Sequence, residues 1–507
     1  MELPDNPILA GCYPDPSVCR VGDDYYLVTS TFEYFPGLPV FHSTDLVEWT
    51  QLGHALDRTN QLDLSTVPSS GGLFAPTIRH HEGTWYIACT LVHGEGRQGN
   101  FVLTADDPAG PWSDPTWIDG ADGIDPSLFF DTDGRLWMCG TRLSATPLWH
   151  DQTDVWLREL DPVTLDVVVD ETLLWHGALE GAVWAEGPHL YRRNGWYYLL
   201  ASEGGTEFDH ALSVARSRSV DGPYIGHTAN PALTHRTLGH AHPVSAVGHA
   251  DLVETADGEW FAVLLASRPY GGGYHANLGR ETYIVAVEWE NEWPVFAPGV
   301  GQVRATAPEE SPEPRMPTPL EWTQVRTADS GFATVGQAAG AVTLEARPGP
   351  FSRVATPAFI GVRQRHKSVA FRATLDTATL VGPPTPSTAG LAARQSESAH
   401  LMLTVTGGAE AAAAVALRTT GGASEVIGRV PLEEGPVTLE IRAELQDYRL
   451  WVETGGRRVL VASVDGRFLS SQVAGGFLGV WLGLVAMGDP AQLVEFTGIT
   501  YGRAIDG

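Results

Sequence analysis

A short motif occurs five times between residues 11 and 263 and limits the folds open to this chain. Each copy leads into an apolar, aromatic run, as 25–30 does after the first copy. One position, which we call the slot, lies just before the motif's proline or at the equivalent place, and holds Asp15, Ala75, Asp125, Glu186 and His249. Copies about 50–65 residues apart are typical of a propeller or a repeat array.

The residues that follow each motif indicate short antiparallel strands. A Gly or Asp-Gly signal splits a hairpin-like pair in each copy, as at 131–134 and 256–258. A third strand often follows, and evenly spaced short strands are typical of four-stranded blades. Five copies therefore predict five blades. If each copy starts the innermost strand of its blade, the slot residues share one end of a central channel, and three carboxylates converge there.

The rest of the chain predicts a second all-β unit. A chain of 507 residues is too long for one compact core. Residues 304–319 are rich in Pro and Glu and read as an extended linker. Residues 320–507 alternate apolar and polar side chains with period two, which favours an antiparallel β-sandwich. We therefore expect an all-β protein with a five-bladed β-propeller at 1–303 and a concanavalin-like β-sandwich at 320–507.

The net charge, the N-terminal sequence and the cysteines indicate which partners and which cell compartment to expect for this protein. The net charge of −29 argues against nucleic acid or an anionic membrane as a partner and is compatible with a neutral substrate. No apolar run is long enough to cross a bilayer, and the N-terminus lacks the features of a signal peptide. We expect a cytoplasmic protein; a secreted one whose signal has been removed is the alternative. The four cysteines have no CxxC spacing, and we expect buried free thiols.

The three slot carboxylates suit the hydrolysis of a glycosidic bond. That reaction needs one acid to protonate the leaving oxygen and one carboxylate to activate water or attack carbon. A third carboxylate can raise the pKa of the acid by its charge. Asp15, short and fixed between two prolines, fits the base, and Glu186, longer and followed by Gly187, fits the proton donor. Any one of them alone is explained by an ordinary turn, as Asp131 and Asp133 are, but the repeated slot is not.

Five further residues are candidates for substrate binding. Phe32 follows the first inner strand and Phe74 lies beside a slot, where rings can pack on sugar C–H faces. Arg280 lies in a polar turn and can form hydrogen bonds to hydroxyls or to an acid of the triad. Thr206 supports the same argument more weakly. His249 either faces the axis, where it binds water or a metal, or is a hydrogen-bonded core histidine; one histidine alone does not define a metal site.

Four motifs in order resemble glycoside hydrolase family 43, in its β-xylosidase and α-L-arabinofuranosidase branch with a C-terminal concanavalin-like sandwich. They are 13–17 (Tyr-Pro-Asp-Pro-Ser), 123–129 (Gly-Ile-Asp-Pro-Ser-Leu-Phe), 185–191 (Ala-Glu-Gly-Pro-His-Leu-Tyr) and 278–282 (Leu-Gly-Arg-Glu-Thr). The resemblance is strong to about residue 303 and looser beyond. It implies a five-bladed propeller of inverting enzymes.

The resemblance also implies roles for single residues. Asp15 matches the general base that activates water, Glu186 the general acid, and Asp125 the carboxylate that modulates the pKa of the acid and orients it. Arg280 matches the arginine near the sugar hydroxyls. His249 matches the axial histidine, which in some members binds Ca²⁺ through water at the propeller axis; no cofactor is required.

Two aromatic positions are informative in the same comparison. Phe32 matches a pocket aromatic. Many relatives carry Trp where Phe74 stands, so a smaller ring there can change how the bound sugar sits.

The expected function is that of an inverting exo-glycoside hydrolase. It would release terminal β-D-xylose, α-L-arabinofuranose or both from xylan- or arabinoxylan-derived oligosaccharides. The alternatives are another activity of the same family, such as an arabinanase or galactosidase, and a non-catalytic carbohydrate-binding propeller. We expect an oligosaccharide as partner, with no nucleic acid and no membrane, and leave the oligomeric state open.

Overall fold

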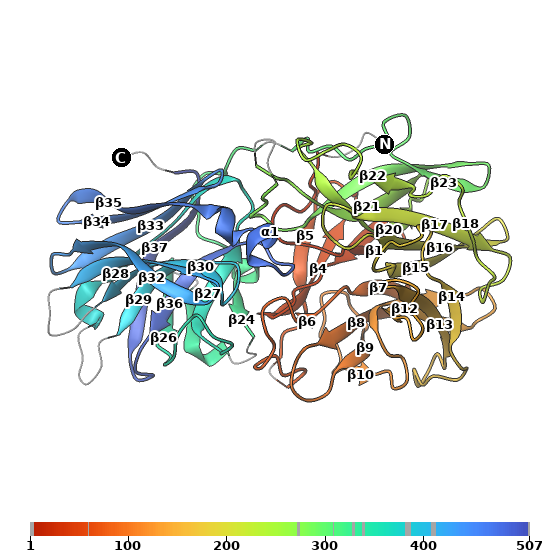
Figure 1. Cartoon of the computed structure of the whole chain (residues 1–507). Helices are drawn as coiled ribbons and strands as arrows, with labels where there is room; N and C mark the ends of the chain where they lie inside the picture. The colour runs from red at the N-terminus through yellow and green to blue at the C-terminus, as the bar shows by residue number, and fades with distance from the viewer. Residues whose placement is uncertain are drawn as a thin grey trace.

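Two β-rich units lie side by side in the computed structural model of this protein (Figure 1). The structure describes residues 5–58, 60–270, 274–307, 309–326, 330–336, 340–380, 387–406 and 412–504. Within these ranges α1 (Ser471–Ala474) is the single α-helix, beside four short 3₁₀ turns, η1 (Pro319–Glu321), η2 (Ser330–Phe332), η3 (Thr377–Leu380) and η4 (Gly466–Leu469). None of these helices has the length and apolarity needed to cross a membrane. The expected all-β class is confirmed.

The first unit consists of five antiparallel sheets. Blade 1 comprises β1 (Ser17–Val21), β2 (Asp24–Val28), β4 (Gly37–Ser43) and β5 (Thr50–Leu56). Blade 2 comprises β6 (Gly72–Leu73), β7 (Thr77–His81), β8 (Thr84–Val92), β9 (Gly99–Ala105) and β10 (Thr116–Trp117). Blade 3 comprises β11 (Ile124–Phe130), β12 (Leu136–Leu143), β13 (Thr153–Leu160) and β14 (Thr172–Trp175).

The last two blades follow the same plan. Blade 4 comprises β15 (Glu186–Arg193), β16 (Trp196–Glu203), β17 (Ala211–Ser217), β18 (Ile225–Gly226) and β19 (Leu233–Thr234). Blade 5 comprises β20 (Ser245–Glu254), β21 (Trp260–Ser267), β22 (Glu281–Glu290) and β23 (Trp293–Phe296). The expectation of five blades built on four antiparallel strands is confirmed, with an additional short strand in blades 2 and 4.

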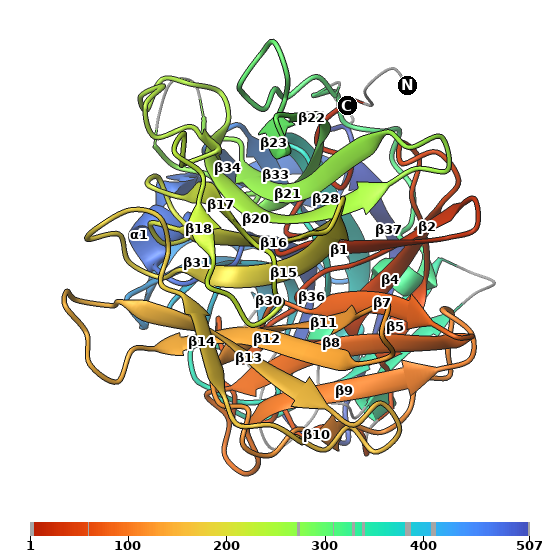
Figure 2. The same ribbon diagram turned by 90° about the vertical axis from the view of Figure 1, so that its right-hand side faces the viewer.

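The blades close into a ring around a common centre (Figure 2). The first full strands of successive blades contact one another in order, and β20 of the last blade contacts β1 of the first. A separate apolar cluster packs between each pair of neighbouring blades, including the pair formed by blades 5 and 1. In that last cluster, Leu9 also forms a β-bridge with Thr282, so the N-terminal segment helps to close the ring. Apolar burial between blades therefore holds the five inner strands together.

The second unit is a sandwich of two antiparallel sheets. One sheet has the strand order β3 (Tyr34–Phe35), β24 (Thr323–Val325), β27 (Ala358–Arg363), β36 (Trp481–Met487), β29 (Thr388–Arg394), β30 (Ala399–Thr406), β31 (Ala413–Thr420) and β32 (Ala423–Pro431). The other has the order β25 (Ala333–Gly336), β26 (Ala341–Glu345), β37 (Leu493–Gly502), β28 (Ser368–Asp376), β33 (Pro436–Glu444), β34 (Asp447–Thr454) and β35 (Arg457–Asp465). Alternating residues of both sheets, such as Leu401 and Leu403 of β30 and Leu439 and Ile441 of β33, form the core between them.

The two units share a strand. The two-residue strand β3 belongs to the first 303 residues but pairs with β24 at the edge of the sandwich sheet. The ring of Tyr34 stacks on that of Trp481 from β36, with the centroids 3.9 Å apart. Trp481 also donates a hydrogen bond from Nε1 to Thr323 Oγ1 at 3.0 Å. The sandwich is therefore packed on the propeller through main-chain and aromatic contacts, and the boundaries at 303 and 319 stay predictions.

The four cysteines are free thiols, as expected. Cys12, Cys89 and Cys139 are buried, and Cys19 is partly buried. Burial raises the pKa of the Cys19 and Cys139 thiols to about 12. These thiols therefore act as small apolar side chains in the propeller.

Substituting Trp481 by Ala tests the junction between the two units. Trp481 is 1% exposed and stacks on Tyr34, so Trp481→Ala leaves a large cavity at the junction. We expect the free energy of unfolding to fall by about 3–5 kcal/mol, measured by equilibrium denaturation. Trp196→Ala, which removes a half-buried ring in contact with Arg218, is the control and costs about 1 kcal/mol. Equal losses in the two variants would contradict this account of the junction.

Candidate active site

The three acidic slot residues lie where the inner strands begin and the regular ladder is interrupted. Asp15 precedes β1, Asp125 is the second residue of β11, and Glu186 is the first residue of β15. The pairing of β11 with β12 and of β15 with β16 shifts register at these two acids. Asp15 and Asp125 adopt φ values of 57° and 56°, a region that Asp tolerates better than most residues. Bulges and left-handed residues re-aim side chains and are common beside active sites.

These positions bring the three carboxylates together in one pocket of about 220 Å³. Phe32, Phe74, Thr206, Arg280 and His249 line the same pocket, so it contains every site residue expected from the sequence. Ala75, the slot residue of the second blade, also lines it. The slots of all five blades therefore reach one cavity at the end of the propeller that faces the sandwich.

Asp15 is held as a carboxylate by its neighbours. Arg280 donates from Nη1 to Asp15 Oδ1 at 2.9 Å, and Ser30 Oγ donates to Asp15 Oδ2. His249 Nδ1 lies 3.9 Å from the same Oδ1. Burial alone would raise the pKa of Asp15, but Arg280, His249 and Ser30 outweigh it and hold that pKa below its usual value. Asp15 is therefore charged and able to accept a proton.

The pKa values of Asp125 and Glu186 are shifted upwards, in contrast to that of Asp15. Burial, with the negative charge of Asp15 adding to it, raises the pKa of Asp125 to about 6, although His249 and the Gly187 N–H oppose the rise. Burial and the charges of Asp125 and Asp15 raise the pKa of Glu186 well above its usual value. Glu186 thus keeps its proton to a higher pH than an ordinary glutamate does.

The residue after Glu186 must be a glycine. Gly187 has φ +58°, and a Cβ there would lie 2.8 Å from the His249 ring. Its N–H donates to Asp125 Oδ2 at 3.0 Å. The close approach therefore fixes the main chain beside Glu186 against both Asp125 and His249.

Three phenylalanines form an aromatic wall of the pocket. The rings of Phe32 and Phe74 are 5.5 Å apart, and those of Phe32 and Phe477 are stacked at 5.8 Å. The Arg280 guanidinium lies over Phe32 and Phe477, 5.6 and 5.4 Å from their centroids. Phe477 lies between α1 and β36, so the sandwich supplies part of the wall.

Sequence reasoning missed several residues of this pocket: His93, Ile124, Trp184 and Phe477. Ile124 and Trp184 stand one and two residues before an acidic slot, and that adjacency was the available signal. Phe477 lies in a glycine-rich stretch far along the chain, outside the repeats, and nothing in the sequence pattern links it to the slots.

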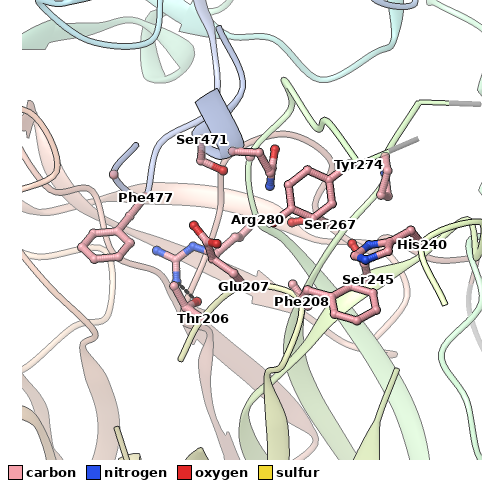
Figure 3. A pocket seen from close by; sticks show the side chains of 15 residues that line it. Thr206, Glu207, Phe208, His240, Ser245, Ser267, Tyr274, Arg280, Ser471 and Phe477 are labelled. Carbon is pink, nitrogen blue, oxygen red and sulfur yellow. Dashed lines mark hydrogen bonds between the residues drawn. The ribbon is translucent and has the colours of Figure 1, made fainter. Parts of the chain in front are cut away.

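A smaller pocket of about 30 Å³ adjoins the first (Figure 3). Thr206, Arg280 and Phe477 line both pockets and so form the wall between them. Arg280 Nη1 donates to Thr206 Oγ1 at 2.8 Å, while the buried Arg280 Nε has no hydrogen-bond partner among the described residues. The arginine is thus fixed by Asp15 and Thr206 through Nη1.

The other acids near the third motif have structural roles. Asp131 is buried and accepts from Arg192 Nη1 at 2.8 Å and from Tyr197 OH at 2.7 Å. Asp133 lies in the hairpin turn and pairs with Arg135. Neither lines the pocket.

The protein groups around His249 do not fit a directly bound calcium ion. Ca²⁺ takes about 6–8 oxygen ligands. In the part of the chain that the structure describes, no three His, Cys, Asp or Glu side chains are arranged to hold a metal ion. The Arg280 guanidinium also places a positive charge on the carboxylate nearest to His249. Calcium bound through water at His249 stays a prediction.

Comparison with known families matches both units. The family described as "Glycosyl hydrolases family 43" matches residues 4–294. The family described as "Beta xylosidase C-terminal Concanavalin A-like domain" matches residues 315–497. The expected concanavalin-like character of the sandwich is confirmed.

Individual relatives are similar over nearly the whole chain. A xylosidase/arabinosidase of Butyrivibrio fibrisolvens is 38% identical over 505 residues, covering 96% of each protein. A non-reducing end α-L-arabinofuranosidase of Bacteroides ovatus is 37% identical, covering 96% of this chain and 91% of the relative. The crystal structure of a xylan β-1,4-xylosidase from Bacillus halodurans matches with a TM-score of 0.88 at 31% identity, covering 99% of both chains. The chain therefore belongs to glycosyl hydrolase family 43.

Proposed function

We propose that this glycoside hydrolase is an inverting exo-enzyme that releases terminal β-D-xylose, α-L-arabinofuranose or both from xylan- or arabinoxylan-derived oligosaccharides. The observation that carries the proposal is that two carboxyl groups of one pocket have pKa values shifted in opposite directions. The pKa of Asp15 is lowered and that of Glu186 is raised, which is the pairing that general base and general acid catalysis requires.

The proposed reaction is a single displacement at the anomeric carbon. Asp15 takes a proton from a water molecule as the water oxygen forms its bond to that carbon. Glu186 gives its proton to the glycosidic oxygen as the bond to the leaving group breaks. Asp125 keeps Glu186 protonated by its charge and holds the adjacent Gly187 N–H, so it positions the acid. No cofactor is needed, because these groups supply both proton transfers.

The pocket dimensions and its polar groups support exo-action. A volume of about 220 Å³ lies below the 300–1,000 Å³ or so of sites for drug-sized ligands, which favours one sugar residue over a chain. The Arg280 guanidinium lines the pocket and can donate to a sugar hydroxyl, and the aromatic wall supplies faces for C–H groups. The xylosidase/arabinosidase and arabinofuranosidase names of the relatives support the two proposed sugars.

Two alternatives keep the same pocket. An arabinanase or galactosidase activity would use the same three acids on another sugar. A non-catalytic sugar-binding propeller would need no carboxyl group that stays protonated, so the raised pKa of Glu186 favours catalysis over binding alone. A panel of nitrophenyl β-xyloside, α-arabinofuranoside and β-galactoside separates these readings, and hydrolysis of none of them would overturn the proposal.

Removing the base and removing the acid have distinguishable effects. Asp15→Asn lowers kcat/KM by about 10²–10⁴-fold on both xylobiose and nitrophenyl β-xyloside, because every turnover needs an activated water. Glu186→Gln has a loss of similar size on xylobiose but a much smaller one on nitrophenyl β-xyloside, since nitrophenolate leaves without a proton. Asp133→Asn, at the exposed turn of blade 3, is the matched control and keeps wild-type rates. The same substrate pattern in both active-site variants would refute these roles.

The charge of Asp125 sets the alkaline limit of activity. A negative neighbour favours the protonated form of Glu186, so Asp125→Asn lowers the pKa of Glu186. Because the acid must be protonated, we expect the alkaline limb of the kcat/KM profile on xylobiose to move to lower pH. An alkaline limb that stays in place or moves to higher pH would contradict this role of Asp125.

A further inference from the structure

The main chain of Phe477 is hydrogen-bonded to the propeller. Phe477 N donates to Ser70 Oγ at 2.9 Å, which joins two residues 407 positions apart in the sequence. Ser70 lies in the loop between β5 and β6, outside the catalytic pocket. This hydroxyl therefore holds the main chain of a residue whose ring forms part of the aromatic wall.

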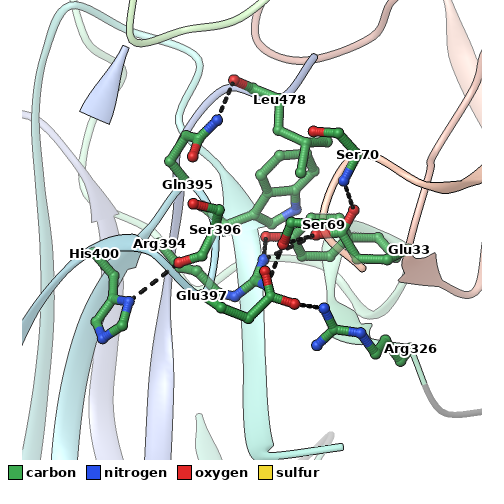
Figure 4. A network of polar contacts seen from close by, with 12 residues as sticks. Glu33, Ser69, Ser70, Arg326, Arg394, Gln395, Ser396, Glu397, His400 and Leu478 are labelled. Carbon is green, nitrogen blue, oxygen red and sulfur yellow. Dashed lines mark hydrogen bonds and ion pairs between the residues drawn. The ribbon is translucent and has the colours of Figure 1, made fainter. Parts of the chain in front are cut away.

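Ser70 is itself fixed by a buried charge. Its N–H donates to Glu33 Oε2 at 3.0 Å, and Ser69 Oγ donates to Glu33 Oε1 at 2.8 Å (Figure 4). Glu33 is fully buried and directly follows Phe32, another ring of the same wall. One carboxylate therefore connects the loop of Ser70 with the segment that carries Phe32.

The charge of Glu33 is balanced from the sandwich. Arg394 Nη1 lies 3.2 Å from Glu33 Oε1 and donates to Tyr34 OH at 2.8 Å. Arg394 Nη2 donates to Ser69 Oγ and lies 3.6 Å from Glu397, which also pairs with Arg326 (Figure 4). Two arginines and two glutamates thus form a network of ion pairs across the junction in which the charges balance.

The Phe477 turn is held from its other side as well. Gln395 Nε2 donates to Gly475 O at 3.0 Å, and Gly479 N donates to Cys12 Sγ at 3.4 Å. Gly476 has φ +74°, and a Cβ there would lie 2.3 Å from Ser70 Oγ. Glycine is therefore required for the turn to approach Ser70 closely enough for the hydrogen bond.

We infer that Ser70 is a positioning residue of the active site. Its hydroxyl, fixed by Glu33, holds the main chain of Phe477 and thereby sets where that ring lies against Phe32 and the terminal sugar. The inference rests on the proposed function, because it concerns how the terminal sugar binds in the same pocket. It goes beyond it by assigning a role in substrate positioning to a residue that touches neither the substrate nor the three acids.

A double-mutant cycle with Phe477 tests this role. Ser70→Ala lowers kcat/KM for the preferred nitrophenyl glycoside by about 10-fold, chiefly through KM, since a displaced wall weakens the seating of the sugar. In a Phe477→Ala background the same change costs less than about 2-fold, because the ring that Ser70 positions is gone. The measurement uses the full chain. Ser70→Gly suits the φ of +67° at this position and carries the same test if Ser70→Ala does not fold.

Ser69→Ala is the matched control. Ser69 contacts Glu33 and Arg394 in the same network but not Phe477, so its loss changes kcat/KM by less than about 2-fold. Equal losses for Ser70→Ala with and without the Phe477 ring would overturn the inference, as would an equal loss in Ser69→Ala. An active wild type with such results overturns this inference alone, whereas a wild type inert on the whole panel overturns the proposed function too.

Discussion

The ion pair between Arg280 and Asp15 governs how protons are distributed over three buried carboxyl groups. One arginine cannot neutralise three acids, so the acid that it contacts stays charged and the others retain protons to higher pH. His249 and Ser30 also lower the pKa of Asp15. The fold enforces the crowding, because the inner strands are held in a ring by apolar packing between the blades. The difference in proton affinity between these acids thus depends chiefly on which of them the guanidinium contacts.

The pocket is a product of both units. The propeller supplies the acids, and the sandwich supplies Phe477, whose ring lies on the same guanidinium that holds Asp15. The strand β3 and the Tyr34–Trp481 stack join the units beside this wall. A buried network of paired charges lies behind it and links Phe32 with Phe477 through Glu33 and Ser70. The junction therefore fixes the shape of the pocket as well as the arrangement of the two units.

The sequence predicts the parts of this arrangement that recur. Five motif copies indicate five blades, and their equivalent positions indicate that Asp15, Asp125 and Glu186 meet. Contacts that do not repeat leave no periodic signal: Phe477 lies in a turn outside the repeats, and β3 crosses to the sandwich with only two residues. The direction in which each pKa shifts depends on burial and on which acid Arg280 contacts, and neither can be obtained from spacing. The roles of the individual residues come from the resemblance to the family and stay predictions.

Proton NMR at early times of hydrolysis tests the central claim most directly, because it reports on which side of the sugar the water attacks. With Asp15 activating water opposite the protonated leaving group, a β-xyloside yields α-xylose as the first product, and the β-anomer appears later by mutarotation. β-Xylose as the first product would mean a double displacement with a covalent intermediate. That result would contradict the assignment of Asp15 as the base and Glu186 as the acid of a single step.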